Sequence, residues 1–198
     1  MHELILASSS KTRAALLVSA GVSFDSRPAN IDEEEIQSSL VAENCDPLII
    51  AQVLAENKAL AVSRKIPGHL VIGADQILEC RKGVLNKPKS ETEAREQLCL
   101  LRNSEHKLIS SVVVAKDSER LWHNTDVAHL RMRNFSDGFL DSYLADLKDD
   151  LLSGSGCYRV EGPGIQLFER ITGDYSTILG LPLLALLDYL RVQGVVAE

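Results

Sequence analysis

Residues 69–78 read HLVIGADQIL, and this stretch decides the fold class. Leu70, Val71 and Ile72 form a short apolar run, typical of a buried strand, and the acidic Asp75 closely follows it. In α/β proteins, ligands gather at the carboxyl ends of strands. A carboxylate there can hold a metal ion or take a proton from water, or it can only cap the turn that follows. Asp75 is therefore the first candidate for a catalytic residue.

The segments around this strand alternate between strand-like and helix-like patterns. Four more segments are strand-like: 4–7, 107–115, 127–132 and 165–171. Five predicted helices run from the serines at 8–10 to Gly21, from Pro47 to about Arg64, from Ser90 through Leu101, from Ser136 through Leu147, and from Pro182 to near Gly194. Residues 32–35 and 153–156 are interpreted as connections. The alternation predicts an α/β fold with a central mixed sheet, and because no linker interrupts it, we expect residues 1–198 to form a single domain.

The composition argues against nucleic acids and membranes as partners. The 198 residues carry a formal net charge of -7 and contain no polybasic tract, which a phosphate backbone would attract. The longest apolar stretch near the C-terminus contains Pro182 and is too short to cross a bilayer. The N-terminus lacks the basic region of a signal peptide, and the four cysteines form no CxxC pair. We therefore expect a soluble, cytoplasmic protein with reduced cysteines.

Lys58 is the second candidate, because it lies on the apolar face of its predicted helix. A helical wheel places it with Ile50, Leu54 and Ala61, while Gln52 lies opposite. A buried ammonium is costly unless it has a partner, and the phosphate of a ligand is one such partner. The alternative is a side chain whose stem packs while the ammonium reaches water.

Further polar residues cluster near predicted element ends, and each has a structural alternative. Ser8 and Arg13 lie where a strand leads into a helix, whose N-terminus suits a phosphate, although the serines can act as caps alone. The acids at 32–35 offer oxygen ligands for magnesium or simply a solvated surface. Lys87, before Pro88, can reach an anion or remain an exposed turn residue, and Glu161 is similar.

Several kinds of catalytic site are disfavoured by the absence of their motifs. The histidines form no HxH or HExxH pair, so a zinc site is not expected. The chain has no GxSxG nucleophile elbow and no Walker A loop, which argues against covalent acyl chemistry and P-loop hydrolysis.

Six segments in order resemble the Maf family of nucleotide pyrophosphatases, also called septum-formation inhibitor proteins. They read LILASSSKTRAALL, NIDEE, ENKA, VIGADQIL, LNKPKS and GDYSTILGLPLLALL. The resemblance covers essentially the whole chain. It implies a bilobal fold similar to that of inosine triphosphatases. It also implies hydrolysis of a nucleoside triphosphate to the monophosphate and pyrophosphate with Mg²⁺ or Mn²⁺, and a possible homodimer.

The resemblance also implies a role for each matching residue. Ser8 and Arg13 match phosphate-contacting positions, and Lys58 and Lys87 match the two site lysines. Glu33 matches the acidic metal-site position. Asp75 matches the catalytic base and would share the metal with Glu33. In the mechanism this implies, Asp75 deprotonates the water that attacks the α-phosphorus, while Lys58, Lys87 and Arg13 stabilise the departing pyrophosphate.

Three positions depart from the commonest family pattern and concern the substrate. Thr12 replaces an arginine, Gln76 replaces a threonine after the aspartate, and Glu161 replaces a late glutamine. Gln76 and Glu161 resemble the subgroup of 7-methyl-GTP pyrophosphatases, since a carboxylate can accept hydrogen bonds from guanine and balance a methylated base. We interpret all three as substrate-binding positions. A dTTP/UTP pyrophosphatase, an inosine-triphosphate-type pyrophosphatase and a nucleotide-binding regulator of cell division are the alternatives.

Overall fold

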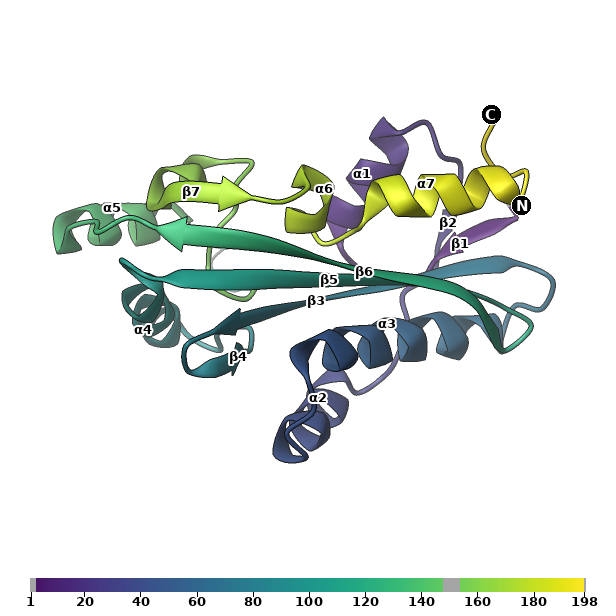
Figure 1. Cartoon of the computed structure of the whole chain (residues 1–198), viewed down its shortest axis with the longest axis horizontal. Helices are drawn as coiled ribbons and strands as arrows, with labels where there is room; N and C mark the ends of the chain where they lie inside the picture. Colours follow the sequence, from purple (N-terminus) through teal and green to yellow (C-terminus); the bar gives the residue numbers. More distant parts are fainter. Residues whose placement is uncertain (1–2, 148–153, 198) are drawn as a thin grey trace. The chain divides into compact units, whose positions relative to one another are not determined.

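The computed structural model describes residues 3–147 and 154–197, and it has the predicted α/β architecture. Helices flank a mixed sheet of seven strands in the order β2-β1-β3-β5-β6-β7, with β4 paired to β3 (Figure 1). The strands are β1 (Leu4–Leu6), β2 (Asp25–Ser26), β3 (Leu70–Cys80), β4 (Gly83–Leu85), β5 (Glu105–Lys116), β6 (Glu119–Met132) and β7 (Phe168–Thr172). The helices are α1 (Lys11–Ser19), α2 (Glu33–Ala42), α3 (Pro47–Ser63), α4 (Glu91–Leu101), α5 (Asp137–Leu147), the 3₁₀ helix η2 (Pro163–Leu167), α6 (Tyr175–Ile178) and α7 (Leu183–Val192).

The sheet is mixed, as the sequence predicts. Strand β1 pairs in parallel with β2 and β3, while β3–β4 and β6–β7 are antiparallel pairs. The chain divides into two compact units. The first comprises Met1–Gln76, Ile109–Val127 and Asp174–Glu198, and the second comprises Ile77–Leu108 and Ala128–Gly173. That residues 1–198 form a single domain stays a prediction.

In the first unit, helices cover both faces of the sheet, with α1 and α7 on one side and α3 on the other (Figure 1). Alternate residues of β3 face the two layers. Leu70, Ile72 and Ala74 belong to the core cluster that includes α1 and α7, whereas Val71 packs with Val62 of α3. Because side chains alternate along a strand, position 75 lies on the α3 side and position 76 on the other.

Glycine at position 73 lets α3 approach β3 unusually closely. A Cβ atom built there would overlap the carbonyl oxygen of Ala55 and lie 2.5 Å from the nitrogen of Ala59. Any side chain would therefore push the helix away from the strand. The close approach brings Lys58, a buried polar residue of α3, beside the end of the first unit's part of β3.

The second unit has a mainly apolar interior with a few buried polar groups. His106 of β5 is 3% exposed, and its Nε2 lies 2.7 Å from the hydroxyl of Tyr158. Its Nδ1 atom is buried and has no hydrogen-bond partner among residues 3–147 and 154–197. Gln97 of α4 connects two loops, since it donates to the carbonyl of Asn86 at 2.9 Å and accepts from the nitrogen of Gly156 at 3.2 Å.

The structure corrects some predicted boundaries. Residues 32–35 are not a loop: Asp32 caps α2 by accepting from the nitrogen of Glu35 at 2.9 Å, and the acids that follow form the first helical turn. Negative charge there is stabilised by the helix dipole, which outweighs mutual repulsion. The strand predicted at 127–132 begins earlier, and the one predicted at 165–171 begins with the turn η2. The connection predicted at 153–156 lies partly outside the described residues.

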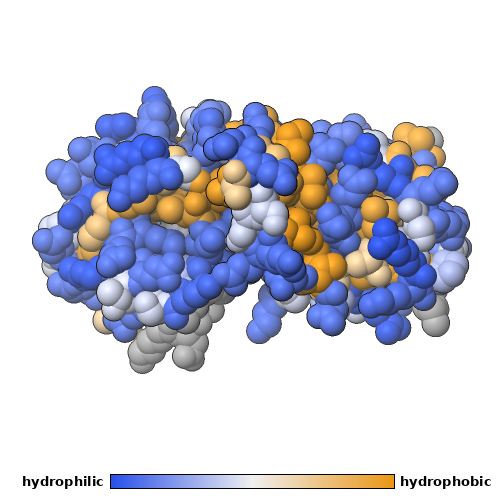
Figure 2. Space-filling model, turned by 90° about the horizontal axis from the view of Figure 1, so that it is seen from below, coloured by the Kyte–Doolittle hydropathy of each residue, from blue (hydrophilic) through white to orange (hydrophobic). Residues whose placement is uncertain are grey.

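One face of the molecule is mainly hydrophilic. On the side seen in Figure 2, hydrophilic residues make up most of the surface, and hydrophobic ones occupy smaller areas between them. Within the described ranges, none of the helices is both long and apolar enough to cross a membrane.

Candidate active site

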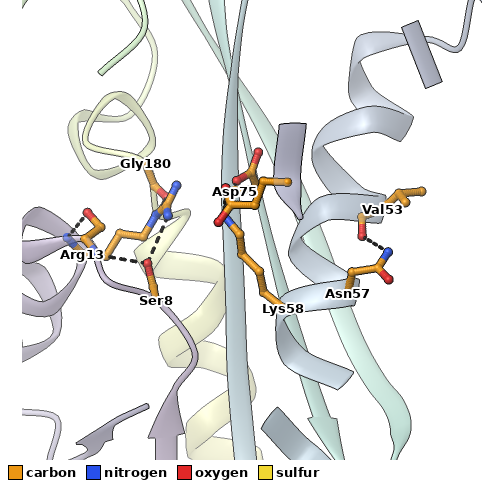
Figure 3. A network of polar contacts seen from close by, with 9 residues as sticks. Ser8, Arg13, Val53, Asn57, Lys58, Asp75 and Gly180 are labelled. Carbon is orange, nitrogen blue, oxygen red and sulfur yellow. Dashed lines mark hydrogen bonds and ion pairs between the residues drawn. The ribbon is translucent and has the colours of Figure 1, made fainter. Parts of the chain in front are cut away.

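A buried lysine and two carboxylates form the centre of the candidate site, in the first unit. The Nζ atom of Lys58 lies 2.6 Å from Oδ1 of Asp75 and 2.7 Å from Oε2 of Glu33. Lys58 is 5% exposed and Asp75 is 7% exposed, so their ion pair is buried. Figure 3 shows the lysine reaching from α3 toward the aspartate on β3. The ammonium thus has carboxylate partners and does not extend into water, which excludes the alternative left open by the sequence.

The fold explains why these three groups meet. Asp75 is two residues beyond Gly73 on the same face of β3, and Gly73 is where α3 comes closest. Lys58 lies nearly one turn beyond Ala55, which is in contact with that glycine. Glu33 is the first residue of α2, a helix that packs on α3. Each element therefore brings one charged group to the same point.

The two carboxylates are also the groups that can hold a metal ion. Glu33 and Asp75 share one ammonium, and the described residues contain no cluster of three or more His, Cys, Asp or Glu side chains that could hold a metal. Mg²⁺ usually keeps several waters and is bound by one or two carboxylates together with substrate phosphates. The donor set fits an ion that arrives with a phosphate ligand, and it does not fit a closed metal site formed by protein alone.

Arg13 and Ser8 form a second polar group at the junction of β1 and α1. Nε of Arg13 donates to the carbonyl of Gly180 at 2.7 Å, and Nη1 donates to Oγ of Ser8 at 3.2 Å. Figure 3 shows the guanidinium between these two partners. Burial lowers the pKa of Arg13, while the charges of Asp75 and Glu33 act in the opposite direction. Arg13 is thus within electrostatic reach of both carboxylates.

Two serines of this junction, Ser10 and Ser8, have different contacts. Ser10 caps α1 by accepting from the nitrogen of Arg13 at 3.3 Å, as a serine cap is expected to do. Ser8 is 6% exposed and accepts from the nitrogen of Ser10 as well as from Arg13. Thr12 is half-buried in the first turn of α1. The geometry therefore separates a capping serine from one that contacts a cation.

Gln76 lies on the opposite face of β3 from Asp75. Its amide nitrogen is 2.9 Å from Oγ of Ser110 and 3.0 Å from the carbonyl oxygens of both Thr177 and Ile178. The sequence did not predict helix α6, in which these two carbonyls lie, because four residues are too few to show a period. The segment GDYST does contain an Asp174 cap, which accepts from the nitrogen of Ser176 at 2.8 Å.

Two predicted residues belong to the second unit and are exposed. Lys87 lies in the loop between β4 and α4, immediately after Asn86, whose carbonyl Gln97 holds. Glu161 lies in a turn before η2. The structure confirms that both are accessible loop residues, and their contacts with a substrate stay predictions, as do those of the other predicted site residues.

Comparison with known proteins finds one family over almost the whole chain. The family model of Maf-like proteins matches residues 3–193. The chain is 48% identical over 190 residues to a nucleoside triphosphate pyrophosphatase of Paramagnetospirillum magneticum, covering 96% of this chain and 98% of that protein. It is 47% identical over 189 residues to a 7-methyl-GTP pyrophosphatase of Brucella abortus, covering 96% of this chain and 95% of the relative. A 7-methyl-GTP pyrophosphatase of Rhizobium meliloti is 45% identical over 193 residues, 98% of this chain and 97% of its own length.

Proposed function

Because the chain belongs to the Maf-like protein family, we propose that it hydrolyses a nucleoside triphosphate to the nucleoside monophosphate and pyrophosphate. The names of similar proteins support this activity, and two of them name 7-methyl-GTP as the substrate. The observation that carries the proposal is the buried ammonium of Lys58 between the carboxylates of Asp75 and Glu33.

Asp75 is the proposed general base. Its Oδ1 accepts a hydrogen bond from Lys58 at 2.6 Å, which fixes the orientation of the carboxylate. Because Lys58 occupies Oδ1, the other oxygen, Oδ2, is the one proposed to accept the proton of a water. A positioned carboxylate that takes a proton in the transition state accelerates a reaction by about 10²- to 10⁴-fold. The water then attacks the α-phosphorus, and the bond to the bridging oxygen of the pyrophosphate breaks.

Ser8 and Arg13 are proposed to bind the phosphate groups. They lie at the N-terminus of α1, where backbone N–H groups and the helix dipole favour an anion. Nε and Nη1 of Arg13 are held by Gly180 and Ser8, while Nη2 has no hydrogen-bond partner in the described part of the chain. An arginine that the protein holds in this way is suited to stabilise charge that develops on pyrophosphate. Lys58 and Lys87 are the further cations proposed for this task.

The activity is proposed to depend on Mg²⁺ or Mn²⁺, with Glu33 and Asp75 as the ligands that the protein supplies. When bound, such an ion neutralises phosphate charge and polarises the phosphorus–oxygen bonds. Lys58 holds both carboxylates toward one point, which supports this pairing. The protein is proposed to act in the cytoplasm on a small nucleotide, without nucleic acid partners, and to form a homodimer.

Glu161 is proposed to favour a methylated guanine, because a carboxylate can accept the N–H groups of the base and balance its positive charge. Hydrolysis of dTTP or UTP is the alternative within the family, and Glu161→Gln distinguishes the two. If this substitution leaves the ratio of kcat/KM for 7-methyl-GTP and UTP unchanged, Glu161 does not select the base.

The test is a panel of dTTP, UTP, CTP, GTP, ITP and 7-methyl-GTP, incubated with the protein and Mg²⁺ or Mn²⁺ and followed by chromatography. We expect monophosphate and pyrophosphate, with 7-methyl-GTP hydrolysed fastest. Asp75→Asn controls for a contaminating hydrolase. Tight nucleotide binding without turnover of any member would contradict an enzyme and support a nucleotide-binding regulator of cell division.

A further inference from the structure

The amide group of Gln76 donates hydrogen bonds to helix α6. Its nitrogen lies 3.0 Å from the carbonyl oxygens of Thr177 and Ile178 and 2.9 Å from the hydroxyl of Ser110, which itself donates to Thr177 at 2.7 Å. Two of these three partners can only accept, so the nitrogen and not the oxygen of the amide must face them. The donors of Gln76 are therefore directed at this short helix.

The end of α6 shows why it needs an outside donor. The nitrogen of Gly180 donates to Thr177 and that of Leu181 donates to Ser176, both at 3.0 Å, and Gly180 has a φ of 92°. This is the Schellman arrangement, which satisfies the carbonyls of residues 176 and 177. The carbonyl of Ile178 is left over, and the residue four positions on is Pro182, which has no N–H to give. Gln76 supplies the missing hydrogen bond.

The same turn holds Arg13. The carbonyl of Gly180, two residues after Ile178, accepts from Nε of Arg13 at 2.7 Å. The contact is close, since a Cβ atom on Gly180 would lie 3.3 Å from Nε and 3.4 Å from Nη2. A shift of the turn by a few tenths of an ångström therefore moves the guanidinium or breaks its hydrogen bond.

Strand β6 also anchors α6. The hydroxyl of Thr177 donates to Oδ2 of Asp126 on β6 at 2.6 Å, and Asp174 caps the start of the helix. Loss of Gln76 should therefore loosen the end of the helix without detaching it. This makes the last carbonyls, and with them Gly180, the part that depends on Gln76.

We propose that Gln76 is a positioning residue for Arg13: it fixes the end of α6, and the Gly180 carbonyl then aims the guanidinium at the phosphate groups of the substrate. The inference rests on the phosphate-binding role proposed above for Arg13. It assigns the Gln76 amide nitrogen to the protein itself and not to the nucleotide base.

The test is a double-mutant cycle read by calorimetric binding of inorganic pyrophosphate with Mg²⁺, which does not require turnover. Gln76→Met keeps the length of the side chain and removes its hydrogen bonds, and it should weaken binding by about tenfold. In an Arg13→Met background the same substitution should change binding by less than about twofold, because its effect acts through Arg13. Gln52→Met, at a half-buried position of helix α3, is the matched control and should bind like the wild type.

Two results would overturn the proposal. One is unchanged pyrophosphate binding by Gln76→Met; the other is an equal loss in both backgrounds, which would mean that Gln76 acts independently of Arg13. Should Gln76→Met fold poorly, Gln76→Asn, which keeps the amide but withdraws it by one methylene, must give the same cycle. If the wild type binds pyrophosphate but hydrolyses no nucleotide, the proposed function fails while this cycle still decides the role of Gln76.

Discussion

Ionisable side chains are buried in two regions of the chain: in one they are charged and paired, and in the other the side chain is neutral. In the first unit, Lys58 lies between Asp75 and Glu33, so its buried charge has two partners. In the second unit, His106 is surrounded by Tyr158 and Phe168, with ring centroids 5.6 and 6.0 Å away, and its only hydrogen-bond partner in the described residues is a neutral hydroxyl. Burial lowers the pKa of His106 to about 4, so it is neutral at physiological pH.

The difference shows which buried polar group is suited to chemistry. Charges that are paired with one another keep a fixed orientation and leave one carboxylate oxygen free to act. A neutral imidazole among aromatic rings has no such function and contributes packing. Four sets of substitutions, ordered by expected effect, test this contrast.

Asp75→Asn should have the largest effect on catalysis. An amide cannot take the proton from water, so kcat for the preferred triphosphate should fall by about 10³-fold, while circular dichroism shows a folded protein. Glu56→Gln, which breaks the surface pair with Arg120, is the matched control and should retain its activity. An Asp75→Asn variant within about tenfold of the wild-type rate would remove Asp75 from the role of base.

Lys58→Met should have the largest effect on stability. It leaves the buried Asp75 carboxylate without its cation, which costs about 3–5 kcal/mol in the free energy of unfolding measured in urea. Arg120→Met removes the cation of the half-exposed pair with Glu56 and should cost less than about 1 kcal/mol. Adding Asp75→Asn to Lys58→Met should recover part of the loss. If Lys58→Met and Arg120→Met lowered the free energy of unfolding equally, the buried ion pair would contribute no more to stability than the surface ion pair.

His106 should make the protein sensitive to acid. Between its ordinary pKa of 6.5 and its folded pKa of about 4, the unfolded chain binds a proton that the folded chain does not. The free energy of unfolding should therefore fall as the pH drops through this window, by about 3 kcal/mol from this residue.

The measurement compares urea unfolding of the wild type and His106→Phe at several pH values from 7 to 4. The wild type should lose stability relative to His106→Phe toward acid pH, because phenylalanine does not titrate. Parallel stability curves would show that the pKa of His106 is the same in the folded and the unfolded chain, and the contrast between the two regions would fail.

Two glycine substitutions, one in each region, should have smaller effects on stability and should differ in their effect on KM. Gly180→Ala places a Cβ against Arg13 at a φ of 92°, so we expect about 1 kcal/mol of destabilisation together with a several-fold increase in KM. Gly156→Ala, at a φ of 80°, would bring a Cβ within 2.7 Å of the Tyr158 ring. It should lower stability more than Gly180→Ala does. A Gly180→Ala variant with normal KM would argue that Arg13 does not contact the substrate.

The centre of the site could be predicted from the sequence because its signals are local. Asp75 at the end of an apolar strand and Lys58 on an apolar helix face each break a hydrophobic pattern, and the structure pairs them. Glu33 was identified through the family resemblance, although its place in the first turn of α2 was not. The mixed sheet could be predicted for the same reason, because hydrophobic periodicity is a local signal, and the structure confirms it.

The environment of Gln76 could not be predicted, because it depends on contacts between distant segments. Its partners Thr177 and Ile178 lie about a hundred residues away in a helix of four residues, which is too short to show a period. The orphan carbonyl of Ile178 exists only because the helix ends where it does, before Pro182. Only in the folded chain does a side chain on β3 reach this carbonyl.

In the proposed reaction, water attacks the α-phosphorus of a nucleoside triphosphate at Asp75. Hydrolysis in water labelled with heavy oxygen tests this most directly. Mass spectrometry of the separated products should find the label in the nucleoside monophosphate and none in the pyrophosphate. Label in the pyrophosphate, or release of labelled inorganic phosphate with a nucleoside diphosphate, would place the attack at another phosphorus and contradict the proposed reaction.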